Sequence, residues 1–179
     1  MHNLRIATPA DALAIARVHV ASWQETYSGL LSAEMIKGHT IESRAAMWAR
    51  IPDPATPSNP TRVFVAERGK AIVGFASCGA QRTHHLRDAG YDGEFAAIYV
   101  LASAQRLGIG SALMQAMATD LASRSFHGAS LWVLQSNAAG CAFYQRMGGN
   151  IVSTQEDRRG ETVLTELAYG WAHLQRLMR

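Results

Sequence analysis

The chain has 179 residues, of which 48% are hydrophobic and 17% are charged, and its formal net charge is +3. This length predicts a single domain over residues 1–179 with a complete hydrophobic core. The composition argues against a membrane protein, because no apolar run approaches roughly 18 residues, and against a nucleic-acid-binding protein, because the positive charge is small and scattered. The N-terminal residues lack the basic and then apolar layout of a secretory signal, so we expect a cytoplasmic protein.

The first third of the chain is predicted to contain one strand and several helices. Residues 3–7 suit a short strand. Thr8, Pro9 and Asp11 then supply an N-cap hydroxyl, a proline at the first helical position and an acidic side chain in the first turn, which predict the start of a helix. The helix is expected to end at Ser28 and Gly29, with further helical segments at residues 32–37 and 41–51. Its expected buried stripe comprises Ala12, Ile15, Ala16 and His19.

The next part of the chain is predicted to form a loop and a hairpin. Residues 52–60 contain four of the five prolines, which predicts a surface loop. Residues 62–67 and 71–79 flank a short turn and predict a β-hairpin. The polar residues 82–93 predict a loop that leads into the central strand.

The C-terminal part is predicted to end in a second hairpin and a helix. The two strands cover residues 150–154 and 162–168, with a turn at 157–160. The tail, residues 170–179, places Trp171, Leu174 and Leu177 on one helical face.

Residues 94–121 form the stretch around which the other elements are organised. The strand that begins here is apolar on both faces, as expected of a central strand covered on each side. One face carries Phe95, Ala97, Tyr99 and Leu101, and the other carries Ala96, Ile98 and Val100. After Gly110, apolar residues recur at three- and four-residue steps and predict an amphipathic helix.

The junction between this strand and this helix contains Gln105, Gly108 and Gly110. Glycines in a strand-to-helix turn let free backbone N–H groups gather at the positive end of the helix dipole, which favours binding of a phosphate. A Cβ atom would keep a bulky diphosphate away from these amides. Taken alone, the pattern is also compatible with a tight turn that binds nothing.

A second motif follows a strand-like segment at residues 130–136. It begins at Asn137 and continues through Phe143 and Tyr144 to Gly148. In combination, the two motifs make the chain similar to the GNAT superfamily of N-acetyltransferases, which carry Q/R-x-x-G-x-G/A and, about thirty residues later, N-x-x-A-x-x-F-Y-x-x-x-G. The resemblance covers roughly residues 4–169. It implies a mixed α/β fold with a mostly antiparallel, twisted sheet of about seven strands, flanked by helices, in which strands four and five splay apart and form the coenzyme cleft.

The resemblance also implies a binding site for acetyl-coenzyme A as co-substrate. The diphosphate is expected on the amides that follow Gln105, namely those of Arg106, Leu107, Gly108, Ile109, Gly110 and Ser111. The backbone near Ile98, Tyr99 and Val100 is expected to bind the pantetheine arm and the thioester oxygen through the strand bulge of the family. Asn137 is expected to contact the pantetheine, although it also suits the N-cap of the helix that follows.

For catalysis, the resemblance assigns Tyr144 as the general acid beside the thioester sulfur and Glu94 as the base. The alternatives are a packed aromatic ring for Tyr144 and a solvated carboxylate at a strand end for Glu94. His84 and His85 are further candidates for the base. Adjacent histidines point apart on an extended chain, and Cys78 and Cys141 lack the spacing of metal ligands, so we expect free buried thiols and no metal site.

Two residues depart from the family pattern. Gly140 stands where an alanine is usual, which should cost the helix about 1 kcal/mol, and Gly149 stands where an aromatic residue usually follows Gly148. We therefore expect different packing behind the coenzyme arm.

Trp23, Glu25 and Tyr27 lie where family members shape the acceptor pocket, although Trp23 and Tyr27 also have the spacing of core residues. The acceptor is expected to be a small amine or a peptide N-terminus, and the sequence leaves its identity and a homodimer open. A coenzyme sensor with the same fold and no turnover is the main alternative. Nucleotide binding of the Rossmann or P-loop type is disfavoured, because the third glycine and the Gly-Lys-Ser/Thr signature are missing.

Overall fold

The computed structural model describes residues 2–51, 61–159 and 162–178. The predicted proline-rich loop at 52–60 lies outside the described residues, as does Gly160 of the predicted turn. The chain packs as two compact units. The first unit comprises Met1–Cys78 and Ala97–Met117, and the second comprises Gly79–Ala96 and Ala118–Arg179.

Among the described residues, seven strands hydrogen-bond in the order β1-β2-β3-β4-β5-β7-β6. β4 and β5 pair in parallel, whereas β1 with β2, β5 with β7 and β6 with β7 pair antiparallel. Mixed pairing with helices between the strands confirms the predicted α/β class and the predicted number of strands. The strands are β1 Asn3–Ile6, β2 Thr61–Arg68, β3 Ala71–Ala80, β4 Gly93–Val100, β5 Ala129–Leu134, β6 Asn150–Arg159 and β7 Thr162–Trp171.

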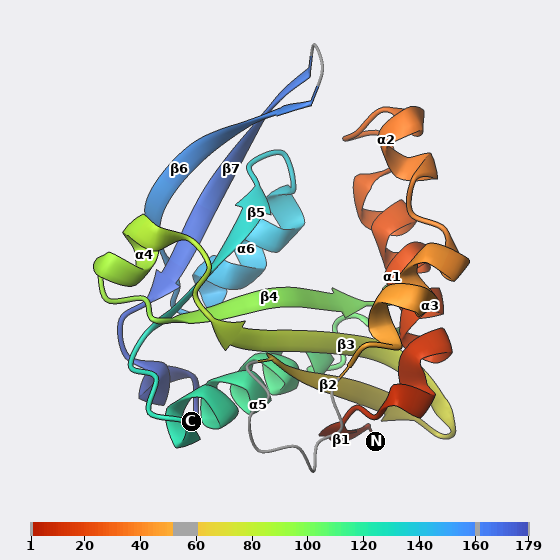
Figure 1. Cartoon of the computed structure of the whole chain (residues 1–179), viewed down its shortest axis with the longest axis horizontal. Coiled ribbons are helices and arrows are strands. Elements are labelled where there is room, and N and C mark those ends of the chain that lie inside the picture. The colour runs from red at the N-terminus through yellow and green to blue at the C-terminus, as the bar shows by residue number, and fades with distance from the viewer. Residues whose placement is uncertain (1, 52–60, 160–161, 179) are drawn as a thin grey trace. The chain divides into compact units, whose positions relative to one another are not determined.

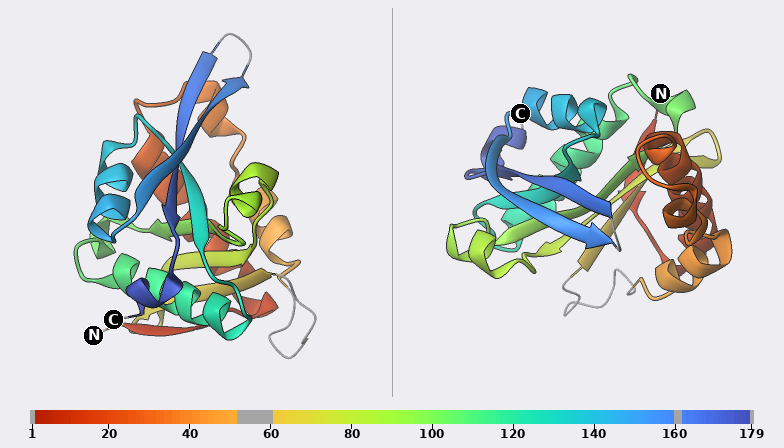
Figure 2. Two further views of the ribbon diagram at one scale, coloured as in Figure 1. Left: turned by 90° about the vertical axis from the view of Figure 1, so that its left-hand side faces the viewer. Right: turned by 90° about the horizontal axis from the view of Figure 1, so that it is seen from above.

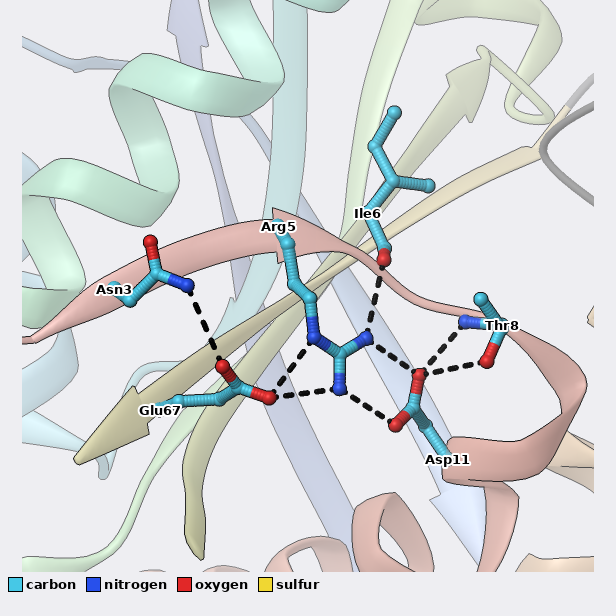
Figure 3. A network of polar contacts seen from close by, with 6 residues as sticks. All are labelled: Asn3, Arg5, Ile6, Thr8, Asp11 and Glu67. Atoms are coloured by element: carbon cyan, nitrogen blue, oxygen red, sulfur yellow. Dashed lines mark hydrogen bonds and ion pairs between the residues drawn. The ribbon is translucent and has the colours of Figure 1, made fainter. Parts of the chain in front are cut away.

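A network around Arg5 fixes the start of the first unit (Figure 3). The Arg5 guanidinium donates to both carboxylate oxygens of Asp11, at 2.7 and 2.8 Å, and to Glu67 on β2 at 2.9 Å. The helix starts after Thr8, as predicted, but the Thr8 hydroxyl does not act as the predicted cap: the Asp11 carboxylate accepts from the Thr8 backbone N–H at 2.8 Å and from the Thr8 hydroxyl at 3.1 Å. The hydrogen bonds from Arg5 lower the pKa of Asp11 to about 2. This network joins β1, the beginning of the first helix and β2.

The helices of the first unit cover its apolar strands. The first helical segment is a 3-10 turn, η1 Pro9–Asp11, which continues as α1 Ala12–Tyr27. α2 Ala33–Lys37 and α3 Ile41–Trp48 follow, capped by the Ser32 and Thr40 hydroxyls. α1 and α3 lie side by side in Figure 1 and bury one shared core. Its buried members include the predicted stripe of α1 together with Trp48, Val63, Val65 and Phe75.

The second unit is built on β5, β6 and β7. β6 and β7 form a long twisted ribbon, seen from two further directions in Figure 2, and are longer than the predicted hairpin. The tail prediction was wrong, because β7 extends to Trp171 and is followed by a 3-10 turn, η3 Leu174–Leu177. The three apolar residues of the tail are all buried, namely Trp171, Leu174 and Leu177. Their spacing therefore indicated burial correctly, although the segment is not an α-helix. α6 Ala138–Arg146 lies between β5 and β6 in the chain.

The predicted loop at 82–93 contains a short helix, α4 His84–Asp88. It begins after Thr83, whose backbone N–H donates to the Gln81 side chain at 2.9 Å, and it buries Leu86. Polar composition concealed this helix, because one buried leucine is enough to hold a single turn in place.

β4 and β5 part after only two residue pairs, Gly93 with Ala129 and Glu94 with Ser130. β5 instead pairs along its whole length with β7. The Gln81 side-chain amide donates to the Ser130 hydroxyl at 2.6 Å and to the Gly93 carbonyl at 3.4 Å, and Gln81 and Ser130 are both buried. This amide joins the two strands where their pairing stops, and the splay expected between strands four and five begins there.

No helix among residues 2–51, 61–159 and 162–178 combines the length and the apolar character that crossing a bilayer requires.

Candidate functional site

The glycine turn between β4 and α5 has an unusual backbone. After a 3-10 turn, η2 Ala102–Ala104, the chain reaches Arg106 with φ of 59° and Gly108 with φ of 78°, and α5 Ile109–Ser123 begins directly afterwards. A positive φ at a residue other than glycine is uncommon and marks a locally constrained loop. The side chains of residues 105–108 are exposed. The turn therefore presents its backbone to the outside at the N-terminus of a 15-residue helix.

The amide groups of this turn are available to a ligand. Within the described part of the chain, the N–H groups of residues 106–111 find no acceptor, and the first to do so is that of Ala112, which donates to the Gly108 carbonyl at 3.0 Å. A Cβ atom built on Gly108 would meet no atom within 4 Å, so this side of the turn is open. Free amides, the helix dipole and open space are the combination that binds phosphate oxygens.

Two predicted site residues hold the turn in shape. Gln105 donates from Nε2 to the Val100 carbonyl at 3.1 Å and so joins the turn to the end of β4. Glu25 accepts from the Ala102 N–H at 2.9 Å and caps the start of η2. The two hydrogen bonds position the backbone of the turn, and each uses a polar atom of the Gln105 or Glu25 side chain.

Gly74 on β3 was not singled out from the sequence. A Cβ atom at Gly74 would lie 3.1 Å from the Tyr99 carbonyl and 3.5 Å from Ile109 Cγ2, so glycine permits a close approach between β3, β4 and α5. An isolated glycine inside a predicted strand is the signal that could have revealed it.

Seven rings of the first unit form one cluster, which we call the ring cluster. Its members come from α1, α3, β3, β4 and the segment between α2 and α3: His19, Trp23, Tyr27, His39, Trp48, Phe75 and Tyr99. The rings of Trp23 and His39 stack with their centroids 4.2 Å apart, and the ring centroids of His19 and Tyr99 are 4.8 Å apart. Trp48, Phe75 and His19 are buried, while the remaining rings are half-buried. The half-buried rings include two of the predicted acceptor-site residues, Trp23 and Tyr27.

His19 is held as a neutral base inside the ring cluster. Its side chain is 7% exposed, and its Nδ1 accepts a hydrogen bond from Trp48 Nε1 at 3.1 Å. A neutral imidazole that accepts at Nδ1 carries its proton on Nε2. Burial, together with the charges of Arg44 and His39, lowers the pKa of His19 from 6.5 to about 4.

The lowered pKa of His19 predicts a specific pH dependence of stability. The unfolded chain takes up a proton at His19 below pH 6.5, whereas the folded chain does so only near pH 4. The free energy of unfolding should therefore fall as the pH falls between these values, by up to about 1.4 kcal/mol per pH unit. Urea unfolding should show a steeper fall of stability between pH 6.5 and 4 in the wild type than in His19→Asn, because asparagine keeps an acceptor for Trp48 but does not titrate. Parallel slopes would contradict the assignment.

Glu94 lies at the start of β4 in the second unit and is 7% exposed. Its carboxylate accepts from Arg82 at three nitrogens: Nε at 2.8 Å, Nη2 at 2.6 Å and the backbone N–H at 3.3 Å. The Glu94 carboxylate also raises the pKa of Arg82. Glu94 is therefore a buried, ion-paired carboxylate, which differs from the solvated strand end considered as the alternative.

Substitutions of Glu94 and of its partner Arg82 test whether Glu94 acts as the base. Glu94→Gln should lower kcat/KM about 10- to 100-fold, with the largest loss at lower pH, where the amine depends most on proton removal. Arg82→Lys keeps a positive charge beside the carboxylate, so it should retain the wild-type pH dependence. A pH-rate profile of Glu94→Gln parallel to that of the wild type would exclude a role in proton transfer.

Asn137 is the N-cap of α6, and its Oδ1 accepts from the Gly140 N–H at 3.0 Å. Its Nδ2 has no acceptor among the described residues, so one end of the amide caps the helix and the other is available. A Cβ atom at Gly140 would lie 2.7 Å from Asn137 Nδ2. Gly140 thus replaces the usual alanine because it makes room for the capping side chain.

Tyr144 on α6 is half-buried, and its ring lies 5.9 Å from Tyr169 and 6.3 Å from Trp171. The Trp171 indole donates to the Met147 carbonyl at 2.9 Å and covers Gly149, where a Cβ atom would lie 2.6 Å from the ring. The ring of Trp171 on β7 therefore packs at the place where an aromatic side chain is usual at position 149. These contacts hold the Tyr144 ring against the C-terminal strand.

His84 and His85 both lie on α4, where His84 Nδ1 contacts Arg87 at 2.9 Å and His85 Nε2 contacts Ser153 at 3.1 Å. Among the described residues, neither cysteine takes part in a disulfide; Cys78 is buried, as predicted, whereas Cys141 is only half-buried. Within the described ranges, no three or more His, Cys, Asp or Glu side chains are grouped to hold a metal ion.

The comparisons with known proteins agree on one family. A model described as the Acetyltransferase (GNAT) family matches residues 22–149. The chain is 32% identical over 178 residues to YuaI, described as an uncharacterized N-acetyltransferase of Bacillus subtilis (strain 168), and the match covers 99% of this chain and 96% of that one.

Solved structures share the fold. The PaiA N-acetyltransferase of Thermoplasma acidophilum, in complex with coenzyme A, has a TM-score of 0.70 at 19% identity, covering 93% of this chain and 98% of that one. The yncA protein of Salmonella typhimurium, solved with its cofactor acetyl-CoA, has a TM-score of 0.70 at 18% identity, covering 96% and 94%.

Proposed function

Because the chain belongs to the acetyltransferase (GNAT) family, we propose that it transfers the acetyl group of acetyl-coenzyme A to a primary amine, which attacks the thioester directly. In this reaction the amine nitrogen forms a bond to the carbonyl carbon, the bond from carbon to sulfur breaks, the thiolate leaves with the electron pair, and the amine loses a proton. The chain has to bind the donor, polarise the carbonyl, favour the neutral amine and stabilise the thiolate.

The observation that carries the proposal is the set of free amides at residues 106–111 beside the open face of Gly108. A diphosphate offers several anionic oxygens to these N–H groups, and hydrogen bonds to charged groups contribute about 1.5–3 kcal/mol each. Gln105 keeps the turn in place through its bond to Val100. The backbone of Ile98, Tyr99 and Val100 is assigned to the pantetheine arm and the thioester oxygen, and Asn137 Nδ2 to the pantetheine.

Tyr144 is assigned to the departing sulfur. A phenol of pKa about 10 is a weaker acid than a thiol of pKa about 8.5, so complete proton transfer is uphill by about 2 kcal/mol. Tyr144 therefore acts mainly as a hydrogen-bond donor to the developing thiolate. An alkyl ammonium is neutral in less than about one per cent of molecules at pH 7, so Glu94 is assigned to remove its proton.

We propose that the whole chain is one acetyltransferase domain. The family model supports this, because it matches the continuous stretch of residues 22–149.

The proposal is tested in two steps. Calorimetry with acetyl-coenzyme A should give saturable binding, and thiol release should then be followed across a panel of primary amines. Absence of heat and of any thermal shift with acetyl-coenzyme A would refute the proposal. Binding without thiol release for any amine, peptide N-termini included, would favour the alternative, a coenzyme sensor without turnover.

A further inference from the structure

Arg44 on α3 carries a positive charge that no described acidic side chain neutralises. Its side chain is half-buried, its Nε is buried without a hydrogen-bond acceptor among the described residues, and its Nη1 contacts only Met47 Sδ, at 3.6 Å. Burying a guanidinium N–H without an acceptor is costly, so such a group is expected to meet one when the protein is occupied.

Arg44 borders the ring cluster. It lies one helical turn before Trp48, on the same face of α3. Its charge also acts on His19, which accepts the Trp48 hydrogen bond. Arg44 is thus placed near a set of half-buried rings in the first unit.

A second donor in the ring cluster is unsatisfied as well. Trp23 Nε1 is buried and has no acceptor within the described ranges, although its ring stacks on His39. The ring cluster and its border therefore combine apolar ring faces with two N–H donors and a positive charge. Ring faces alone would suit a cation, but the charge of Arg44 repels one, and neutral His19 does not offset it. The ligand chemistry that satisfies all of these groups is an apolar body with an anionic oxygen.

The ring cluster also borders the strand segment assigned to the thioester, because Tyr99 of β4 is one of its members and lies 4.8 Å from His19. We propose that the acetyl acceptor is an amino acid with an apolar or aromatic side chain, whose carboxylate binds Arg44 while its side chain packs on the rings of Trp23, Tyr27 and Tyr99. This inference rests on the proposed function and adds the chemical class of the acceptor. Arg44 acts as a specificity-determining residue, since it binds the carboxylate of the acceptor and not the reacting amine.

Matched pairs of amines test the inference, each pair differing only in the carboxylate: L-phenylalanine with 2-phenylethylamine, L-tryptophan with tryptamine, and L-leucine with isoamylamine. Binding to the protein with coenzyme A present is measured by calorimetry, and kcat/KM is measured by thiol release. The wild type should favour the carboxylate-bearing member about 10- to 100-fold, as expected for a charge-assisted hydrogen bond.

Three variants isolate the role of Arg44. Arg44→Met should abolish the preference and leave the affinity for the amine without a carboxylate within about twofold, whereas Arg44→Lys should retain part of the preference. Arg50→Met removes the same charge from an exposed position two residues after α3 and should keep the full preference.

The outcomes separate the two proposals. Equal binding of both members of every pair by the wild type would overturn the inference, as would equal loss of preference in Arg50→Met. If acetyl-coenzyme A fails to bind while calorimetry still shows the carboxylate preference, the proposed function is refuted and the carboxylate site at Arg44 is supported.

Discussion

Gly108→Ala should weaken acetyl-coenzyme A binding by about 100-fold. Gly108 has φ of 78°, and its open face lies within the free amides of residues 106–111. An added methyl group would occupy space that the diphosphate needs, and the positive φ is unfavourable for alanine. Loss of one or two charge-assisted hydrogen bonds accounts for an effect of this size. Titration calorimetry with acetyl-coenzyme A and with coenzyme A measures it directly.

Gly69 provides a matched control for this substitution. It has φ of 62°, a Cβ atom there would also meet nothing within 4 Å, and it lies in the turn between β2 and β3. Gly69→Ala should lower the thermal stability about as much as Gly108→Ala and leave the dissociation constant unchanged. If the Gly108 variant binds the coenzyme with wild-type affinity, the turn does not hold the diphosphate.

Tyr144→Phe should lower kcat by about 100-fold while the dissociation constant of acetyl-coenzyme A changes by less than about threefold. The phenol is assigned to the thiolate, whose charge develops only in the transition state, so its removal should slow turnover more than it weakens binding. The ring itself stays packed near Tyr169 and Trp171, so phenylalanine preserves the contacts. Steady-state kinetics and calorimetry on one preparation separate the two effects.

Tyr169→Phe is the control for Tyr144→Phe. Tyr169 is a buried neighbour of Tyr144 on β7, and the same hydroxyl is removed from the adjacent ring. We expect its kcat to remain within about threefold of the wild type. A Tyr144→Phe variant that loses binding and turnover in equal proportion would count against the assignment to the sulfur.

The buried ion pair between Glu94 and Arg82 could not be predicted from the sequence. The strand end was identified, but its partner Arg82 lies twelve residues earlier, after a different strand. Nothing in the local pattern couples the two positions. The same applies to Trp48 and His19, which are 29 residues apart and meet because α1 and α3 pack together.

Local chemistry was sufficient wherever an element depends on its own neighbours. The helix start after Thr8, the strand β4 and the glycines before α5 follow from backbone geometry and side-chain periodicity, and all three are present. The tail at 170–179 was mistaken for a helix because burial of Trp171, Leu174 and Leu177 imitates helical spacing.

By itself, the sequence determined the family, the order of the strands along the chain and the glycine turn at 105–110, because each of these follows from short motifs and from the local periodicity of apolar residues. Only the tertiary structure decided that Gly140 makes room for Asn137, that Trp171 covers Gly149, and that the charge of Arg44 lies beside a cluster of rings. These contacts join residues from separate elements. Their energies depend on burial and on which polar groups find partners, and neither exists until the chain has folded.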